Sequence, residues 1–138
     1  MKVIGLKGRK GSGKSHTINI VYSFLLRDGY SQVPGYFRVL GNPKFEDVFD
    51  ILTKDGVKVG IIGMGDFQKG KGGLGNLIKG MEKNGCDVVV CACRNEPKIE
   101  KGVTQYKNHH FVDKTISTGN NNNRIVNVID AERVIRLI

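Results

Sequence analysis

Apolar positions in the first fifth of the chain follow two different periods. Residues 2–6 form a short, almost continuous apolar run, which is typical of a buried strand. Residues 12–29 instead carry apolar side chains at helical spacing, at Ile18, Val21, Tyr22 and Leu25. Arg27 and Gly29 are the residue types that favour a helix end there. The start of the chain therefore predicts a strand followed by a helix.

The middle of the chain predicts strands joined by turns. Residues 35–43 read as a short strand that ends in a turn at Asn42-Pro43. Farther on, Asp55-Gly56 separates two β-rich runs, which is a strong hairpin signal. The second run, residues 57–64, is almost entirely apolar or glycine, so we expect a central strand that is covered on both faces.

The second half predicts a helix, two strands and a C-terminal helix. The shorter helix, around residues 75–85, has an apolar side formed by Leu74, Leu77, Ile78 and Met81. Residues 86–94 read as a buried strand, and residues 109–118 as a strand near the sheet edge. A polar break covers 119–126, where four asparagines indicate a loop. Beyond it, apolar residues at 125, 128, 129, 135 and 138 form a helical stripe; the alternative is a strand at 124–129 followed by a short helix.

This order of elements favours an α/β layer fold with a mostly parallel sheet and an added antiparallel hairpin. The 138 residues are enough for one core and too few for two ordinary domains, so residues 1–138 are expected to form a single domain. We see no internal repeat and no linker that would divide the chain.

Composition narrows the class of protein. The net charge of +9 favours nucleotides, nucleic acid or other polyanions as partners. Aromatic residues make up only 7% of the chain, which gives little support to a stacking platform for single-stranded nucleic acid. No run resembles a signal peptide or a membrane span, so we expect a cytoplasmic protein without a membrane partner. The three clustered cysteines suggest neither a disulfide framework nor a zinc site.

The candidate chemistry begins at residues 8–15, GRKGSGKS, which match the pattern G-x-x-x-x-G-K-[ST]. Glycines let a backbone wrap closely round a phosphate, and the N-terminus of the following helix adds positive charge. Lys14 can reach the β- and γ-phosphates of a nucleotide, and the Ser15 hydroxyl can hold Mg²⁺. The pattern requires a strand before it and a helix after it, and both are predicted here.

This stretch resembles the Walker A motif of P-loop NTPases. The resemblance implies a three-layer P-loop NTPase-like fold, a nucleoside triphosphate such as ATP, and Mg²⁺. It implies that the nucleotide contacts Gly8, Arg9, Lys10, Gly11, Ser12, Gly13, Lys14, Ser15 and His16. It also implies an acid at the end of a later strand, the Walker B position, and residues 57–66 supply a buried run that ends at Asp66. Ser15 and Asp66 are then the candidate metal ligands, and Lys14 and Asp66 candidate catalytic residues.

Arg94 completes the candidate catalytic set. It ends the predicted strand at 86–94, and in open α/β sheets ligands lie at the carboxyl ends of strands. Arg94 is therefore placed to contact the base, the phosphates or an acceptor, although surface charge is the simpler interpretation. The hairpin, the Gly65-Asp66 pair and the strand at 86–94 together also resemble small P-loop proteins encoded by bacteria and their phages.

Three further features suggest additional hypotheses. Residues 70–75 match G-x-G-x-x-G, but they lie too far from a strand end for dinucleotide binding, so they suggest a loop in which Lys69 and Lys71 contact phosphate or solvent. Lys98 and Lys101 are candidates for a small lid, although surface charge is the simpler expectation. Asp47 and Asp50 are candidates to accept a proton from an acceptor hydroxyl, although solvated hairpin acids are the simpler expectation.

Three functions remain open from the sequence. The first is an NTPase that hydrolyses the γ-phosphate, usually with an activating partner. The second is a nucleoside or nucleotide kinase, for which residues 37–50 are the only candidate acceptor region. The third is a non-enzymatic nucleotide switch or a basic module that binds nucleic acid.

Overall fold

A computed structural model describes residues 1–117 and 123–138. Its elements follow in the order β1 (Lys2–Gly8), α1 (Lys14–Arg27), β2 (Ser31–Gln32), β3 (Arg38–Leu40), the 3₁₀ turn η1 (Pro43–Phe45), β4 (Asp47–Lys54), β5 (Val57–Ile62), α2 (Leu74–Lys83), β6 (Val88–Arg94), α3 (Pro97–Thr104), β7 (His109–Asp113) and α4 (Asn123–Ile135).

The strands of the described residues form one seven-stranded mixed sheet in the order β2-β4-β5-β6-β1-β7, and β3 also pairs with β4. The half around β1 is parallel, because β5, β6, β1 and β7 all run in the same direction. The other half is antiparallel, because β4 pairs with β5 in the opposite sense and both β2 and β3 pair antiparallel with β4. The predicted α/β class is therefore confirmed, with a sheet that is mixed rather than mostly parallel.

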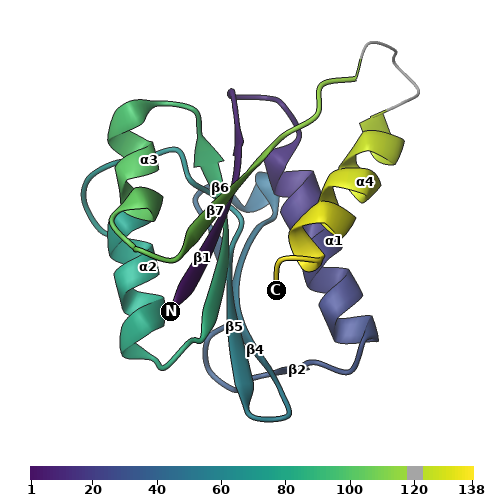
Figure 1. Ribbon diagram of the computed structural model, residues 1–138, viewed down its shortest axis with the longest axis vertical. Coiled ribbons are helices and arrows are strands. Elements are labelled where there is room, and N and C mark those ends of the chain that lie inside the picture. Colours follow the sequence, from purple (N-terminus) through teal and green to yellow (C-terminus); the bar gives the residue numbers. More distant parts are fainter. Residues whose placement is uncertain (118–122) are drawn as a thin grey trace.

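Helices cover both faces of this sheet (Figure 1), with α1 and α4 on one face and α2 and α3 on the other. Alternate side chains of a strand point to opposite faces, and β1 follows this rule. Ile4 and Leu6 belong to the apolar cluster beneath α1 and α4, whereas Val3 belongs to the cluster beneath α2 and α3. Three layers result, and the carboxyl ends of the parallel strands share one edge of the sheet.

The hairpin forms where the sequence predicts it. Asp55 and Gly56 have φ values of 51° and 81°, the left-handed region that a tight two-residue turn requires. Lys54 then pairs with Val57, and the register continues to Phe49 opposite Ile62. The position of the turn thus fixes which residues of β4 lie beside the end of β5.

The predictions for α1, α2, β6 and β7 are also confirmed. In α1, Ile18, Val21 and Leu25 are buried, and Gly29 follows the helix with a φ of 99°. All four apolar residues predicted for α2 are buried, namely Leu74, Leu77, Ile78 and Met81. β7 is an edge strand, and the three cysteines are buried free thiols.

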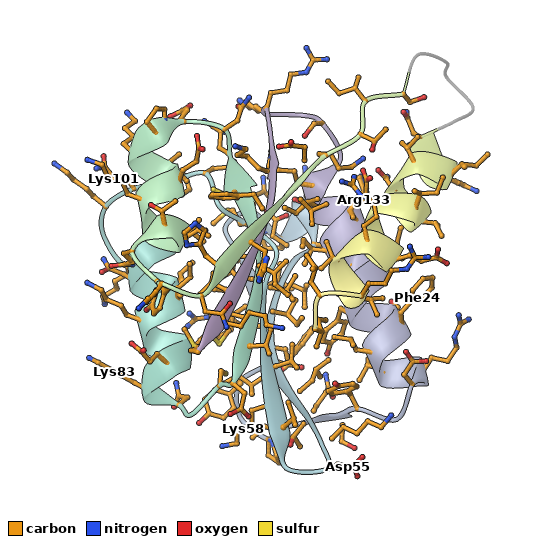
Figure 2. All side chains as sticks on the ribbon, in the orientation of Figure 1. Phe24, Asp55, Lys58, Lys83, Lys101 and Arg133 are labelled. Atoms are coloured by element: carbon orange, nitrogen blue, oxygen red, sulfur yellow. The ribbon has the colours of Figure 1, made fainter. Side chains whose placement is uncertain are left out.

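Lys98 and Lys101 are exposed on a helix, which agrees with the expectation of surface charge. These lysines belong to helix α3, which the apolar pattern did not reveal because the helix is short and begins at Pro97. Its buried side consists of Ile99, Gly102 and Val103. Figure 2 shows Lys101 on the outer side of α3, away from the sheet.

The C-terminal helix forms, and the alternative of a strand at 124–129 is wrong, but its buried side differs from the apolar stripe. Ile125 and Ile129 are 58% and 49% exposed, whereas Asn127 and Asp130 are buried. Hydrogen bonds and an ion pair to Asp130, described below, fix the rotation of α4 and override the apolar pattern. Half of the predicted break at 119–126 lies outside the described residues, and residues 123–126 belong to α4 rather than to a loop.

Candidate functional site

The loop between β1 and α1 is shaped by glycines in conformations that side chains disfavour. Gly11 and Gly13 have φ values of 74° and 93°. A Cβ atom added to Gly8 would lie 2.7 Å from the Oγ atom of Ser12, so the loop closes tightly on itself. No side chain caps the N-terminus of α1, and its first turn contains no acid. The amide groups and the partial positive charge of this helix end are therefore available to an anion.

Lys14 is a buried cation without a carboxylate partner among the described residues. Only 6% of it is exposed, and its Nζ donates a hydrogen bond to the carbonyl oxygen of Arg9, 2.7 Å away across the loop. Burial lowers the pKa of Lys14, and the nearby Asp66 opposes this shift. An ammonium group has three protons to donate, so the group can bind further oxygen atoms of an anion.

A cavity of about 650 Å³ opens above this loop. Its walls include the predicted contact residues from Arg9 to His16, and also Asp66. Gly8, the last residue of β1, is not one of the lining residues. Residues 115–117, Val126 and Asn127 complete the side nearest α4, and neither Thr115 nor Asn127 was predicted to lie at the site.

Asp66 lies beside the loop because the chain after β5 passes very close to β6. A Cβ atom on Gly65 would lie only 1.7 Å from the carbonyl oxygen of Ala92, so only glycine fits there. The amide of Arg94 also donates to the carbonyl of Gly65, at 2.9 Å. This close contact fixes the direction in which Asp66 leaves the sheet.

Arg94 does not line the cavity itself. Its guanidinium group forms an ion pair with Asp66, at 3.2 Å, and a longer one with Glu96, at 3.7 Å. The structure thus brings two of the candidate catalytic residues together, with Arg94 in contact with the acid. Lys69 and Lys71 lie in an exposed loop and are not part of the cavity wall.

The expectation that Asp47 and Asp50 are solvated is wrong. Only 6% of Asp47 is exposed, and Asp50 is fully buried. Asp50 accepts hydrogen bonds from the Tyr22 hydroxyl, at 2.7 Å, and from the amide of Ile51, at 2.8 Å. Asp47 instead lines the cavity beside Ser15, whose hydroxyl donates to the carbonyl oxygen of Gly63 at 3.2 Å.

The charge of Asp47 is poorly compensated. Burial raises the pKa of its carboxyl group, the Ser15 hydroxyl and His16 oppose the rise, and the charge of Asp66 adds to it. The Oδ1 atom of Asp47 has no hydrogen-bond partner. Within the described part of the chain, two other buried side-chain atoms also lack a partner: the Oγ atom of Ser12 and the Nε atom of Arg94. Ser12 and Asp47 line the cavity, and Arg94 is paired with Asp66, which also lines it. Such groups in folded proteins call for a ligand, an ion or water.

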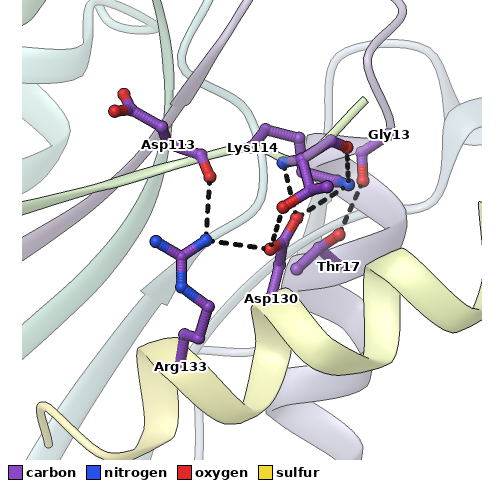
Figure 3. A network of polar contacts seen from close by, with 7 residues as sticks. Gly13, Thr17, Asp113, Lys114, Asp130 and Arg133 are labelled. Atoms are coloured by element: carbon purple, nitrogen blue, oxygen red, sulfur yellow. Dashed lines mark hydrogen bonds and ion pairs between the residues drawn. The ribbon is translucent and has the colours of Figure 1, made fainter. Parts of the chain in front are cut away.

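Behind the loop, a second carboxylate is fully satisfied (Figure 3). Asp130 of α4 accepts a 3.0 Å hydrogen bond from the Lys114 ammonium group, two 2.7 Å bonds from Thr115 and a 3.1 Å bond from Arg133. Burial alone would raise the pKa of Asp130, but the bonds from Thr115 and Lys114 outweigh burial and hold it below its ordinary value.

The Lys114–Asp130 pair supports the loop from behind. A Cβ atom on Gly8 would lie 2.9 Å from the Cβ of Lys114, and one on Gly13 would lie 3.0 Å from the Oδ1 of Asn127. Both side chains of the Lys114–Asp130 pair are completely buried. The end of β7 and the inner side of α4 therefore hold the loop in place.

No protein-family model, curated protein or solved structure matches this chain. In the part of the chain that the structure describes, no group of three or more His, Cys, Asp or Glu side chains could hold a metal ion alone. None of the described helices combines the length and the apolar character that crossing a bilayer demands.

Proposed function

We propose that this protein has a P-loop NTPase-like fold, binds a nucleoside triphosphate such as ATP together with Mg²⁺, and hydrolyses its γ-phosphate. The observation that carries the proposal is Lys14, a buried ammonium group with no acid partner among the described residues. It lies at the uncapped N-terminus of α1, within a glycine loop that forms one wall of the cavity. A buried charge is costly without compensation, and a polyphosphate supplies that compensation.

The residues at the cavity fit a magnesium ion. Mg²⁺ is usually held by one or two carboxylates, with phosphate oxygens and water completing its coordination. Ser15 and Asp66 are the candidate ligands, and a set of this size agrees with the absence of a three-residue metal cluster from the described residues. When bound, Mg²⁺ supplies positive charge that neutralises the phosphate oxygens.

The side chains have separate tasks in this proposal. Lys14 and the amide groups of the loop bind the phosphates and stabilise the charge that develops on them during transfer. Arg94 acts through its ion pair, because it fixes the carboxylate of Asp66 in one orientation. In the hydrolysis, a water oxygen bonds to the γ-phosphorus, and the bond from this phosphorus to the β–γ bridging oxygen breaks. The products that leave are the nucleoside diphosphate, inorganic phosphate and a proton.

Hydrolysis is favoured over transfer to an acceptor. A kinase needs a pocket for the acceptor. In the predicted acceptor region, residues 37–50, Asp47 is the one described residue that lines the cavity. Nucleic-acid binding receives less support from the basic residues labelled in Figure 2, because they lie on different elements. Figure 2 shows Lys83 and Lys101 on α2 and α3, and Arg133 on α4 across the sheet, so basic side chains are spread over both outer faces.

The experiment is a phosphate-release assay with ATP and Mg²⁺, run beside an assay for transfer to nucleosides and nucleoside monophosphates. We expect slow release by the wild type and none by Lys14→Ala. Lys83→Ala is the matched control, because it removes one positive charge from the far end of α2 and should leave release unchanged. Phosphate transfer would replace the hydrolase proposal with a kinase, and release that survives Lys14→Ala would contradict the role of the loop.

A further inference from the structure

Asp47 lies at the site because of the hairpin. The pairing of β4 with β5 ends at Phe49 opposite Ile62, but one more bond follows: the amide of Gly63 donates to the carbonyl of Val48 at 2.6 Å. A Cβ atom on Gly63 would lie 2.8 Å from the backbone nitrogen of Val48. No side chain separates the start of β4 from the segment that leads to Asp66, so the two acids are held near each other by backbone.

Among the buried acids that the structure describes, Asp47 is the one without full hydrogen bonding. Its Oδ1 atom has no hydrogen-bond partner, although only 6% of the residue is exposed to solvent. Asp50, on the same strand, and Asp130, on α4, are also buried, and both carboxylates accept hydrogen bonds. A buried charge with a free oxygen atom is unfavourable unless something else binds that oxygen.

The surroundings of the free oxygen atom favour a cation. Asp47, Asp66 and the Ser15 hydroxyl all line the same cavity, and all three supply oxygen atoms. Two carboxylates in one cavity repel each other, and a hard divalent cation between them removes the repulsion. Arg94 and Lys14 are engaged elsewhere: Arg94 pairs with Asp66 and Glu96, and Lys14 bonds a backbone carbonyl.

We propose that Asp47 is a second carboxylate ligand of the divalent cation, which it holds together with Ser15 and Asp66. This inference rests on the proposed function, because the phosphates of the nucleotide complete the coordination of the ion. Asp47 is the first residue of β4, and Asp66 lies in the segment that follows β5, so the two acids come from the open end of one hairpin. In this arrangement the cation links the hairpin to the first turn of α1.

The test compares ATP binding with Mg²⁺ and with EDTA, by calorimetry, in wild type, Asp47→Asn and Asp50→Asn. We expect the wild type to bind ATP more tightly with Mg²⁺. Asp47→Asn should lose about tenfold or more of that gain, as ligand-shell substitutions commonly do, and should bind metal-free ATP as well as the wild type or better, because a negative charge is removed. Asp50→Asn is the matched control: it changes a buried acid of the same strand and should keep the full gain from Mg²⁺.

A second readout uses Mn²⁺ and electron paramagnetic resonance, with the protein alone and without nucleotide. We expect Asp47→Asn to bind Mn²⁺ more weakly than the wild type and Asp50→Asn do. Equal Mn²⁺ binding by all three proteins would overturn the inference. A full Mg²⁺ gain in Asp47→Asn would overturn it too, even with turnover lost, because Asp47 would then be a general base. If the wild type binds no ATP in either condition, the proposed function fails, and the Mn²⁺ titration alone decides whether Asp47 is a ligand.

Discussion

Two buried carboxylates stand on opposite sides of the Gly8–Ser15 loop, and they differ in their hydrogen bonds. Asp130, behind the loop, accepts bonds from Lys114, Thr115 and Arg133. Asp47, in front of it, keeps an oxygen atom without a partner. Both are almost inaccessible to solvent, so burial alone does not separate them. The difference lies in whether the protein itself supplies the donors.

This difference indicates which acid serves the fold and which serves a ligand. A fully bonded buried acid stabilises one arrangement of the segments around it, here the end of β7, α4 and the loop. A buried acid with a free oxygen atom weakens the fold, and proteins tolerate such groups mainly at functional sites. Substitutions at the two positions should therefore change stability in opposite directions.

The largest effect is expected at Asp130. Asp130→Ala leaves the Lys114 ammonium group buried without its partner, so the free energy of unfolding should fall by about 3–5 kcal/mol. Urea denaturation measures this change. Asp113→Ala, at an exposed acid at the end of β7, is the control and should change stability by less than about 0.5 kcal/mol. A comparably small loss in Asp130→Ala would mean that the network behind the loop is not structural.

A smaller effect on stability is expected when the pH is lowered, because Asp130 becomes protonated. The pKa of Asp130 is held below its ordinary value of 3.8, so the folded state binds fewer protons than the unfolded state in this range. The stability that Asp130 contributes is therefore present above about pH 3.8 and is lost as the pH falls through the lower folded-state pKa. Each unit of depression corresponds to about 1.4 kcal/mol. Denaturation between pH 2 and 5 should show a weaker acid dependence in Asp130→Asn, and an unchanged slope would argue against this assignment.

The smallest change in stability, and the opposite sign, is expected at Asp47. Asp47→Asn removes a buried charge with a free oxygen atom, so at neutral pH and without ligand the free energy of unfolding should rise by about 1 kcal/mol. Thermal and urea unfolding measure the rise. A clear loss of stability would show that the carboxylate of Asp47 supports the fold as Asp130 does, and the comparison between the two acids would break down.

Much of the fold could be predicted because local patterns and tertiary packing agree over most of the chain. The hairpin turn forms at the predicted residues, and α1 and α2 bury the side that their apolar spacing indicates. α4 could not be predicted in the same way, because its rotation depends on Asp130 meeting Lys114, a contact that periodicity does not encode. Helix α3 was missed because eight residues with only two buried apolar side chains, Ile99 and Val103, give too short a pattern.

The site shows the same division. The loop residues could be predicted because their chemistry is contained in one contiguous motif. The position of Asp47 near Asp66 could have been predicted as well. Pairing Lys54 with Val57 and counting back along the hairpin places Asp47 opposite Met64, two residues before Asp66. The ion pair of Arg94 with Asp66 could not, because it depends on how closely the segment after β5 approaches β6.

The central claim is that the loop at 8–15 binds the phosphates of a nucleotide through Lys14. Calorimetric titration of ATP, with Mg²⁺ present, into the wild type and Lys14→Ala tests it most directly, with ADP and GTP as comparisons and Lys83→Ala as the charge control. We expect saturable binding of a triphosphate by the wild type and by Lys83→Ala. We expect a loss of affinity of at least about a hundredfold in Lys14→Ala, because a buried charge-assisted contact is removed. Equal affinity in the wild type and Lys14→Ala, or no binding of any nucleotide by the wild type, would contradict it.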